Sequence, residues 1–85
     1  MRRDMEWKAE RDDGTRYEVR VSCFAKKYRF QFMELGAVKW DYTREPSIAD
    51  LERLCDTVRR RRQRRQASEE DLTRAERLLE IARQP

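Results

Sequence analysis

Apolar and polar residues alternate in four stretches along the first half of the chain, and short polar loops separate them. The stretches cover residues 4–11, 15–25, 28–33 and 37–43, with apolar side chains at every second position. A period of two is typical of a β-strand with one buried face. The pattern therefore predicts a four-stranded antiparallel sheet over residues 4–43.

The lengths of the three loops predict the register of the three hairpins. Loops of three residues that end at Gly14 and Gly36 suit a type I turn followed by a left-handed residue, and Lys26-Lys27 suits a two-residue turn. The apolar face would then hold these cross-strand pairs: Met5–Val21, Trp7–Val19, Ala9–Tyr17, Val21–Phe32, Cys23–Phe30, Ala25–Tyr28, Phe32–Val38, Phe30–Trp40 and Tyr28–Tyr42. A slip by one residue would move the apolar side chains of a strand to the opposite face.

The other face of the predicted sheet is polar and balanced in charge. The same registers place opposite charges across from one another, in the pairs Glu6–Arg20, Lys8–Glu18, Glu10–Arg16 and Arg29–Asp41. Three apolar residues interrupt this face: Phe24, Met33 and Leu35. They are either scattered surface hydrophobes, which are the more common case, or a small exposed patch for protein interaction.

Two amphipathic helices are predicted in the second half of the chain. Ser47 with Asp50, and Ser68 with Asp71, have the spacing of helix-capping boxes, with Asp in place of the usual Glu. The first apolar stripe comprises Ile48, Leu51, Leu54, Cys55 and Val58. The second comprises Leu72, Ala75, Leu78, Leu79 and Ala82.

These elements together predict an α+β fold of order ββββαα, in which both helices pack on the apolar face of the sheet. The chain of 85 residues fits one domain, residues 1–85, with the sheet at 4–43 and a helical part at 47–84. The face that the helices would cover carries Trp7, Val19, Val21, Phe30, Phe32 and Trp40.

Composition adds the cellular location and the state of the cysteines. No apolar run approaches the ~20 residues that span a membrane, and the N-terminal residues lack the apolar core of a signal peptide, so we expect a cytoplasmic protein with no membrane partner. Cys23 and Cys55 are expected to be reduced and buried. A chain with two cysteines and no histidine offers half of a zinc-ligand set, so no metal or cofactor is expected.

The side chains of most enzyme active sites are missing from this sequence. No histidine can act as a general acid or base near neutral pH, and no glycine-rich loop can bind phosphate, since both glycines are explained by turns. Both thiols are predicted to face inward, where they are inert. We therefore expect a protein that is not an enzyme.

A run of arginines is the strongest chemical feature. The net charge is +4, with 17 arginines and 4 lysines. Six of the arginines are Arg59, Arg60, Arg61, Arg62, Arg64 and Arg65. Guanidinium groups bind phosphate and stack on bases. Residues 59–66 resemble in composition the arginine-rich RNA-binding segments of lentiviral regulatory proteins. Alternatively, Asp56 and Glu69–Asp71 pair with these arginines, and the run is a solvated helix end.

The predicted element order allows one further resemblance. Four strands followed by a helix is similar to the order found in a small single-stranded-DNA-binding coactivator fold, which dimerises through its helices. The likeness is one of order alone, and it implies no binding residue in this chain.

The sequence thus leads to two functional hypotheses. The first is a small non-catalytic protein-interaction module that binds either an unknown protein or a second copy of itself. The alternative is a domain that binds RNA or DNA through phosphate contacts of Arg59 to Arg65.

Overall fold

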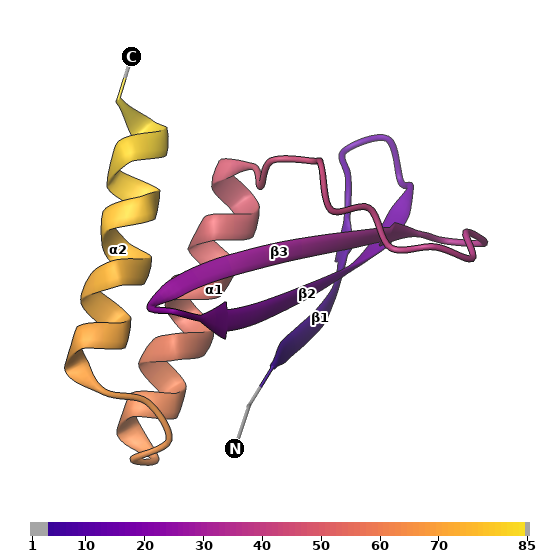
Figure 1. Ribbon diagram of the computed structural model, residues 1–85. Coiled ribbons are helices and arrows are strands. Elements are labelled where there is room, and N and C mark those ends of the chain that lie inside the picture. The colour runs from indigo at the N-terminus through magenta and orange to yellow at the C-terminus, as the bar shows by residue number, and fades with distance from the viewer. Residues whose placement is uncertain (1–3, 85) are drawn as a thin grey trace. The chain divides into compact units, whose positions relative to one another are not determined.

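The computed structural model describes residues 4–84 and contains within them three β-strands followed by two α-helices (Figure 1). The elements are β1 (Met5–Glu10), β2 (Arg16–Phe24), β3 (Lys27–Glu34), α1 (Ile48–Gln63) and α2 (Glu69–Arg83). An α+β chain with an antiparallel sheet and two helices is confirmed, whereas the predicted fourth strand is wrong.

The chain gathers into two compact units, one up to Glu45 and one from Pro46, and each is described by itself. Packing of the helices on the sheet, and the organisation of 1–85 as one domain, stay predictions. Residues 1–3 and 85 belong to that predicted domain and lie outside the described residues.

The β1–β2 hairpin has the predicted register at all six pairs, from Met5–Val21 to Glu10–Arg16. Gly14 has a φ of 89°, which glycine adopts without a steric penalty, and its amide donates to the Arg11 carbonyl at 2.9 Å. On the charged face, Arg20 Nε lies 2.6 Å from Glu6 Oε1.

The β2–β3 hairpin turns one residue earlier than predicted. Ala25 and Lys26 form the turn and both have positive φ, 53° and 63°. Such two-residue turns match the twist of the flanking strands, although these positions usually hold Gly, Asn or Asp. The predicted pair Val21–Phe32 is therefore wrong, because Val21 pairs with Phe30 and Val19 with Phe32. The shift is even, so every side chain keeps its predicted face.

The segment predicted as a fourth strand, residues 37–43, is a loop that touches β3 at a single bridge. Phe32 pairs with Asp41 through two backbone hydrogen bonds of 3.0 and 2.6 Å, where Val38 had been predicted. This offset of three residues is odd, so side chains in the loop change face. Trp40 accordingly lies on the charged face, with the Arg20 guanidinium 4.3 Å from its ring centre.

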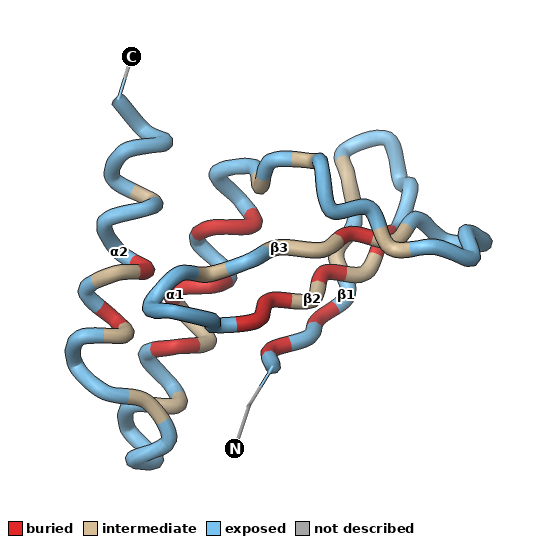
Figure 2. Tube along the Cα trace, in the orientation of Figure 1, coloured by how far each residue is buried: buried red, intermediate tan, exposed pale blue. Residues whose placement is uncertain are grey.

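The predicted apolar face supplies the buried residues of the sheet unit. Figure 2 shows buried positions recurring along β1 and β2, and the buried apolar residues are Met5, Trp7, Tyr17, Val19, Val21 and Phe32. Phe30 and Trp40 are half-buried. The prediction that Cys23 is buried is wrong: the residue is exposed because it lies near the end of β2, beside the turn.

Both helices begin at the predicted capping boxes. Ser47 Oγ accepts a hydrogen bond from the amide of Asp50 at 3.2 Å, and Asp50 Oδ2 accepts one from the amide of Ser47 at 2.9 Å. Ser68 and Asp71 repeat the arrangement at 3.1 and 2.9 Å. Each box satisfies amide groups that the first turn of a helix leaves without partners.

α1 and α2 form an antiparallel helical hairpin (Figure 1). Glu52 and Arg83 are 2.7 Å apart at one end of the hairpin, and Arg62 and Glu69 are 3.8 Å apart at the other. The buried apolar residues are Leu51, Leu54, Cys55 and Val58 in α1, with Leu72 and Ala75 in α2.

Cys55 is buried as predicted, and burial, reinforced by the charge of Glu76, raises the pKa of its thiol. The predicted α2 stripe is only partly buried, because Leu78 and Ala82 are exposed. Neither helix described here is long and apolar enough to cross a membrane.

Candidate interaction surfaces

The arginine run lies where α1 ends and the chain turns toward α2. Arg59, Arg60, Arg61 and Arg62 occupy the last turns of the helix. Arg64 is the C-cap residue, and its amide donates back to carbonyls of the last turn. Arg65 has a positive φ of 61°, which reverses the chain direction. Positive side chains at this end also suit the helix macrodipole.

Carboxylates neutralise much of the run. Arg60 pairs with Asp56 at 3.0 Å, one helical turn away, and Arg62 pairs with Glu69 at 3.8 Å. Arg59 reaches across the helical hairpin to Glu76 at 3.6 Å. Arg61 is half-buried and also has an interaction partner. All three of these ion pairs are solvent-exposed, so each contributes about 0–1 kcal/mol to stability and is easily exchanged for another partner.

Arg64 and Arg65 differ from the other four arginines. Both are exposed, and within residues 4–84 neither side chain makes an ion pair or hydrogen bond. The part of the run that is open to an anionic ligand is therefore this pair in the turn, rather than all six arginines.

The structure does not bring together the three residues of the predicted interaction patch. Phe24 pairs with Lys27 at the turn of the β2–β3 hairpin, whereas Met33 pairs with Glu18. Phe24 lies six positions along β2 from Glu18, which separates it from Met33 by roughly 20 Å at 3.3 Å per residue. Phe24 is 54% exposed, and the Arg29 guanidinium lies 5.6 Å from its ring centre.

Leu35 and Met33 instead belong to a second feature, at the far end of β3. They line a cleft of about 170 Å³ on the sheet unit, next to Tyr17, Gly36 and Ala37. A cavity of about 150 Å³ can hold a benzene molecule, so the cleft has room for one apolar side chain of a partner.

The loop after β3 exposes large apolar side chains. Leu35 is 81% exposed, Val38 91% and Tyr42 69%. We call the segment between Glu34 and Arg44, which carries these three residues, the apolar loop. The three residues account for three of the seven exposed large hydrophobics among the described residues. The sequence pattern missed this feature because Val38 and Tyr42 continue the alternation of a strand. The aspartate at 41, two positions before a threonine, was the available signal of a turn.

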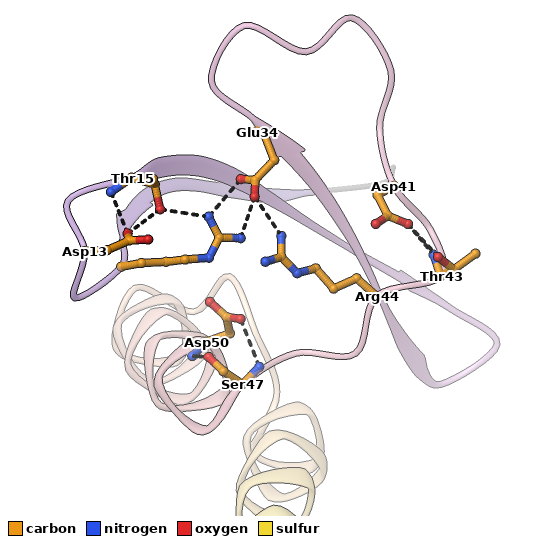
Figure 3. A network of polar contacts seen from close by, with 9 residues as sticks. Asp13, Thr15, Glu34, Asp41, Thr43, Arg44, Ser47 and Asp50 are labelled. Atoms are coloured by element: carbon orange, nitrogen blue, oxygen red, sulfur yellow. Dashed lines mark hydrogen bonds and ion pairs between the residues drawn. The ribbon is translucent and has the colours of Figure 1, made fainter.

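Polar contacts tie the two ends of the apolar loop together (Figure 3). Glu34, at its start, pairs with Arg44, at its end, over 3.5 Å. The same carboxylate pairs with Arg11 at 2.7 Å. The guanidinium groups also cover the adjoining rings, with Arg11 4.3 Å from the centre of Tyr17 and Arg44 5.4 Å from the centre of Phe32.

Two turns next to these contacts are held by carboxylates that bind a threonine (Figure 3). Asp41 Oδ1 accepts hydrogen bonds from the amide and the hydroxyl of Thr43, both at 2.8 Å. Asp13 Oδ1 does the same with Thr15, at 3.0 and 2.7 Å. These bonds favour the ionised form and lower the pKa of both carboxyls. The apolar loop is thus anchored by an ion pair, a backbone bridge and a local turn.

Among residues 4–84, no group of three or more cysteine or carboxylate side chains is placed to hold a metal ion. With three strands in place of four, the element order no longer agrees with that of the coactivator fold. The chain matches no protein-family model, no curated protein and no solved structure.

Proposed function

We propose that this chain is a small non-catalytic protein-interaction module whose binding element is the apolar loop. One observation carries the proposal. Leu35, Val38 and Tyr42 point into solvent from a loop whose ends are held by Glu34 and Arg44 and by the Phe32–Asp41 bridge. Large exposed apolar side chains are typical of binding surfaces on soluble proteins, and three of them lie in this one short loop.

The energetics favour a binding role for such a loop. Complete burial of a side chain of this size contributes about 1.5–3 kcal/mol. A loop that is already ordered also loses less conformational freedom when it binds. Short loops anchored on a sheet are common carriers of binding residues. The expected partner is a protein with an apolar surface that offers one side chain to the cleft beside Leu35.

Site-specific photo-crosslinking in living cells tests this proposal. The crosslinking amino acid benzoylphenylalanine replaces Val38 in the full chain, and a matched variant carries it at Asp12, another exposed loop position. We expect a discrete crosslinked product from position 38 alone. Adding Leu35→Ser and Tyr42→Ser to the Val38 variant should abolish it.

The same experiment can contradict the proposal. No product at position 38, equal products at positions 12 and 38, or a product that survives the two serine substitutions would each show that the apolar loop is not a binding element. Crosslinking of the purified chain alone identifies a product that is a second copy of the protein.

A second function is favoured by a different observation, the open pair Arg64 and Arg65. We propose as the alternative that this turn binds the phosphates of RNA or DNA. Four of the six arginines are already engaged, so two phosphate contacts form without breaking any ion pair of the run. The contacts would carry no sequence specificity, because phosphates are common to all sequences.

Fluorescence anisotropy with short labelled RNA, single-stranded DNA and duplex DNA at several salt concentrations tests the alternative. For duplex DNA, two contacts give a slope of log K against log salt near about −2, and six give about −5. R64Q/R65Q should abolish binding that R59Q/R60Q retains. Binding with no salt dependence, or equal loss in both variants, would exclude the open pair as the site.

A further inference from the structure

The outer edge of β1 is a free edge of the sheet. The strand order is β1-β2-β3, so β1 pairs on one side only, and no other strand among residues 4–84 joins it. The opposite edge of the sheet, along β3, is partly occupied by the bridge to Asp41. A free edge presents unpaired amide and carbonyl groups that can accept another strand.

β1 lacks most of the devices that protect a free edge. Its sequence, MEWKAE, contains no proline and no glycine, and all six residues pair regularly with β2, without a bulge. Charge is the one protecting device present, carried by Glu6, Lys8 and Glu10, and lysine on an edge discourages pairing most. Its effect depends on which residue of the second strand lies opposite.

Overlap, face and charge together select one symmetric register. Two strands related by a twofold axis run antiparallel, and residues directly opposite must share a face. A register centred on Trp7 places Glu6 opposite Lys8 of the second copy, and Lys8 opposite its Glu6. It also sets Met5 against Ala9 of the second copy on the apolar face. A register centred on Lys8 also pairs five residues of β1, but it sets Lys8 against Lys8 and Glu6 against Glu10 of the second copy. Registers centred on Glu6 or on Ala9 pair only three residues of β1.

We propose that two copies of this chain pair antiparallel through β1, in the register centred on Trp7, and form one continuous sheet. Asp4 then approaches Glu10 of the second copy at each end of the paired stretch, where Arg16 opposite Glu10 in its own sheet offsets the negative charge. β1 contributes no residue to the apolar loop or to the arginine run, so this inference stands independently of the proposed function.

Charge reversal on the full chain tests the register. In E6K, the introduced lysine meets Lys8 of the second copy, and in K8E, the introduced glutamate meets Glu6 of the second copy. Each variant replaces two attractive contacts with repulsive ones, so we expect its dimer dissociation constant to rise by about tenfold or more. An equimolar mixture of E6K and K8E restores opposite charges at every contact, and should form a heterodimer as readily as wild type forms its homodimer.

Size-exclusion chromatography with light scattering provides the measurement. K27E, on the opposite edge of the sheet, changes net charge as K8E does and should leave the dimer unaffected. Circular dichroism confirms folding, because Glu6 also pairs with Arg20 within the chain. Monomeric wild type at millimolar concentration would overturn the proposal.

Disulfide crosslinking supplies a second readout, independent of variant stability. In a C23S/C55A background, mixed E6C and K8C chains should crosslink to each other faster than either does to itself. Equal rates for homodimers and heterodimers would overturn the register.

Discussion

Two segments of the sheet unit begin alike and end differently: residues 11–24 and residues 34–44. Each turns at a left-handed glycine, Gly14 with φ 89° or Gly36 with φ 86°. Each contains an aspartate that binds a threonine two positions later. The first continues into β2, whose residues 16–21 all pair with β1, whereas the second makes a single bridge to β3.

The position of the aspartate turn explains the different outcomes. Asp13 lies within the first turn, so its bonds to Thr15 direct the chain back along β1. Asp41 lies in the returning segment itself, where its bonds to Thr43 bend the chain just after the bridge. The odd offset at Asp41 then places Val38 away from the apolar face. Further pairing with β3 would therefore bury no additional apolar surface of Val38.

The largest expected effect is on stability, from the same substitution made in both segments. Val19 is fully buried and Val38 is 91% exposed. Val19→Ala removes two buried methyl groups and should lower the free energy of unfolding by about 2 kcal/mol, counting transfer and the cavity left behind. Val38→Ala should change it by less than about 0.5 kcal/mol. Urea unfolding measures both, and equal losses would contradict the contrast.

The two glycines should differ next. Neither has an atom within 4 Å of an added Cβ, so substitution by alanine introduces only the strain of a left-handed φ. Gly14→Ala should destabilise the fold by roughly 1–2 kcal/mol. Gly36→Ala should cost less than half of that, because the loop that follows can rearrange while losing one bridge. A larger loss at Gly36 would mean that the loop is coupled to the sheet more tightly than the bridge indicates.

A cation–π contact between Arg20 and Trp40 links the two segments, and its expected effect is smaller than those above. A double-mutant cycle with Arg20→Gln and Trp40→Leu should give a coupling energy of about 0.5–1 kcal/mol, as expected for a cation–π contact near the surface. A parallel cycle of Arg20 with Glu6 measures the ion pair within the hairpin. Zero coupling to Trp40 would place the indole elsewhere than on the charged face.

The smallest expected effect is the pH dependence that the two aspartate turns, at Asp13 and Asp41, give to stability. Because both carboxyl pKa values are lowered, the stabilisation is present above the unfolded pKa of 3.8 and is lost as the pH falls through the folded value. The largest cause is the Thr15 hydroxyl for Asp13, but the Thr43 amide for Asp41. Thr15→Val and Thr43→Val should each raise the pKa of the aspartate that the lost hydroxyl binds, as measured by NMR titration; an unchanged pKa in either variant would contradict this assignment.

The sequence predicted the parts of the fold that depend on side-chain alternation along a strand and on local helix capping. Alternation placed Val19 and Val21 on the buried face, and the spacing of Ser47 with Asp50 located the start of α1. Side-chain alternation alone does not distinguish registers of the β2–β3 hairpin that differ by two residues, because both keep the apolar side chains on one face. The turn at Ala25-Lys26 could not be read from propensity, because neither residue favours a positive φ.

The sites were harder to predict than the fold, because exposure depends on register. Val38 and Tyr42 alternate as a strand would, and only the bridge at Asp41 shows that they leave the sheet. The arginines were found from composition, but composition did not reveal that Glu69 and Glu76 engage two of them while Arg64 and Arg65 stay open.

Amide hydrogen exchange across residues 35–43 tests most directly that this segment is an exposed loop rather than a fourth strand. The amide of Asp41 donates to Phe32, whereas those of Val38, Lys39 and Trp40 have no acceptor among the described residues. We expect measurable protection at Asp41 and exchange near random-coil rates at the other three. Alternating protection through residues 38–43, comparable to that in β2, would show a fourth strand and contradict the account.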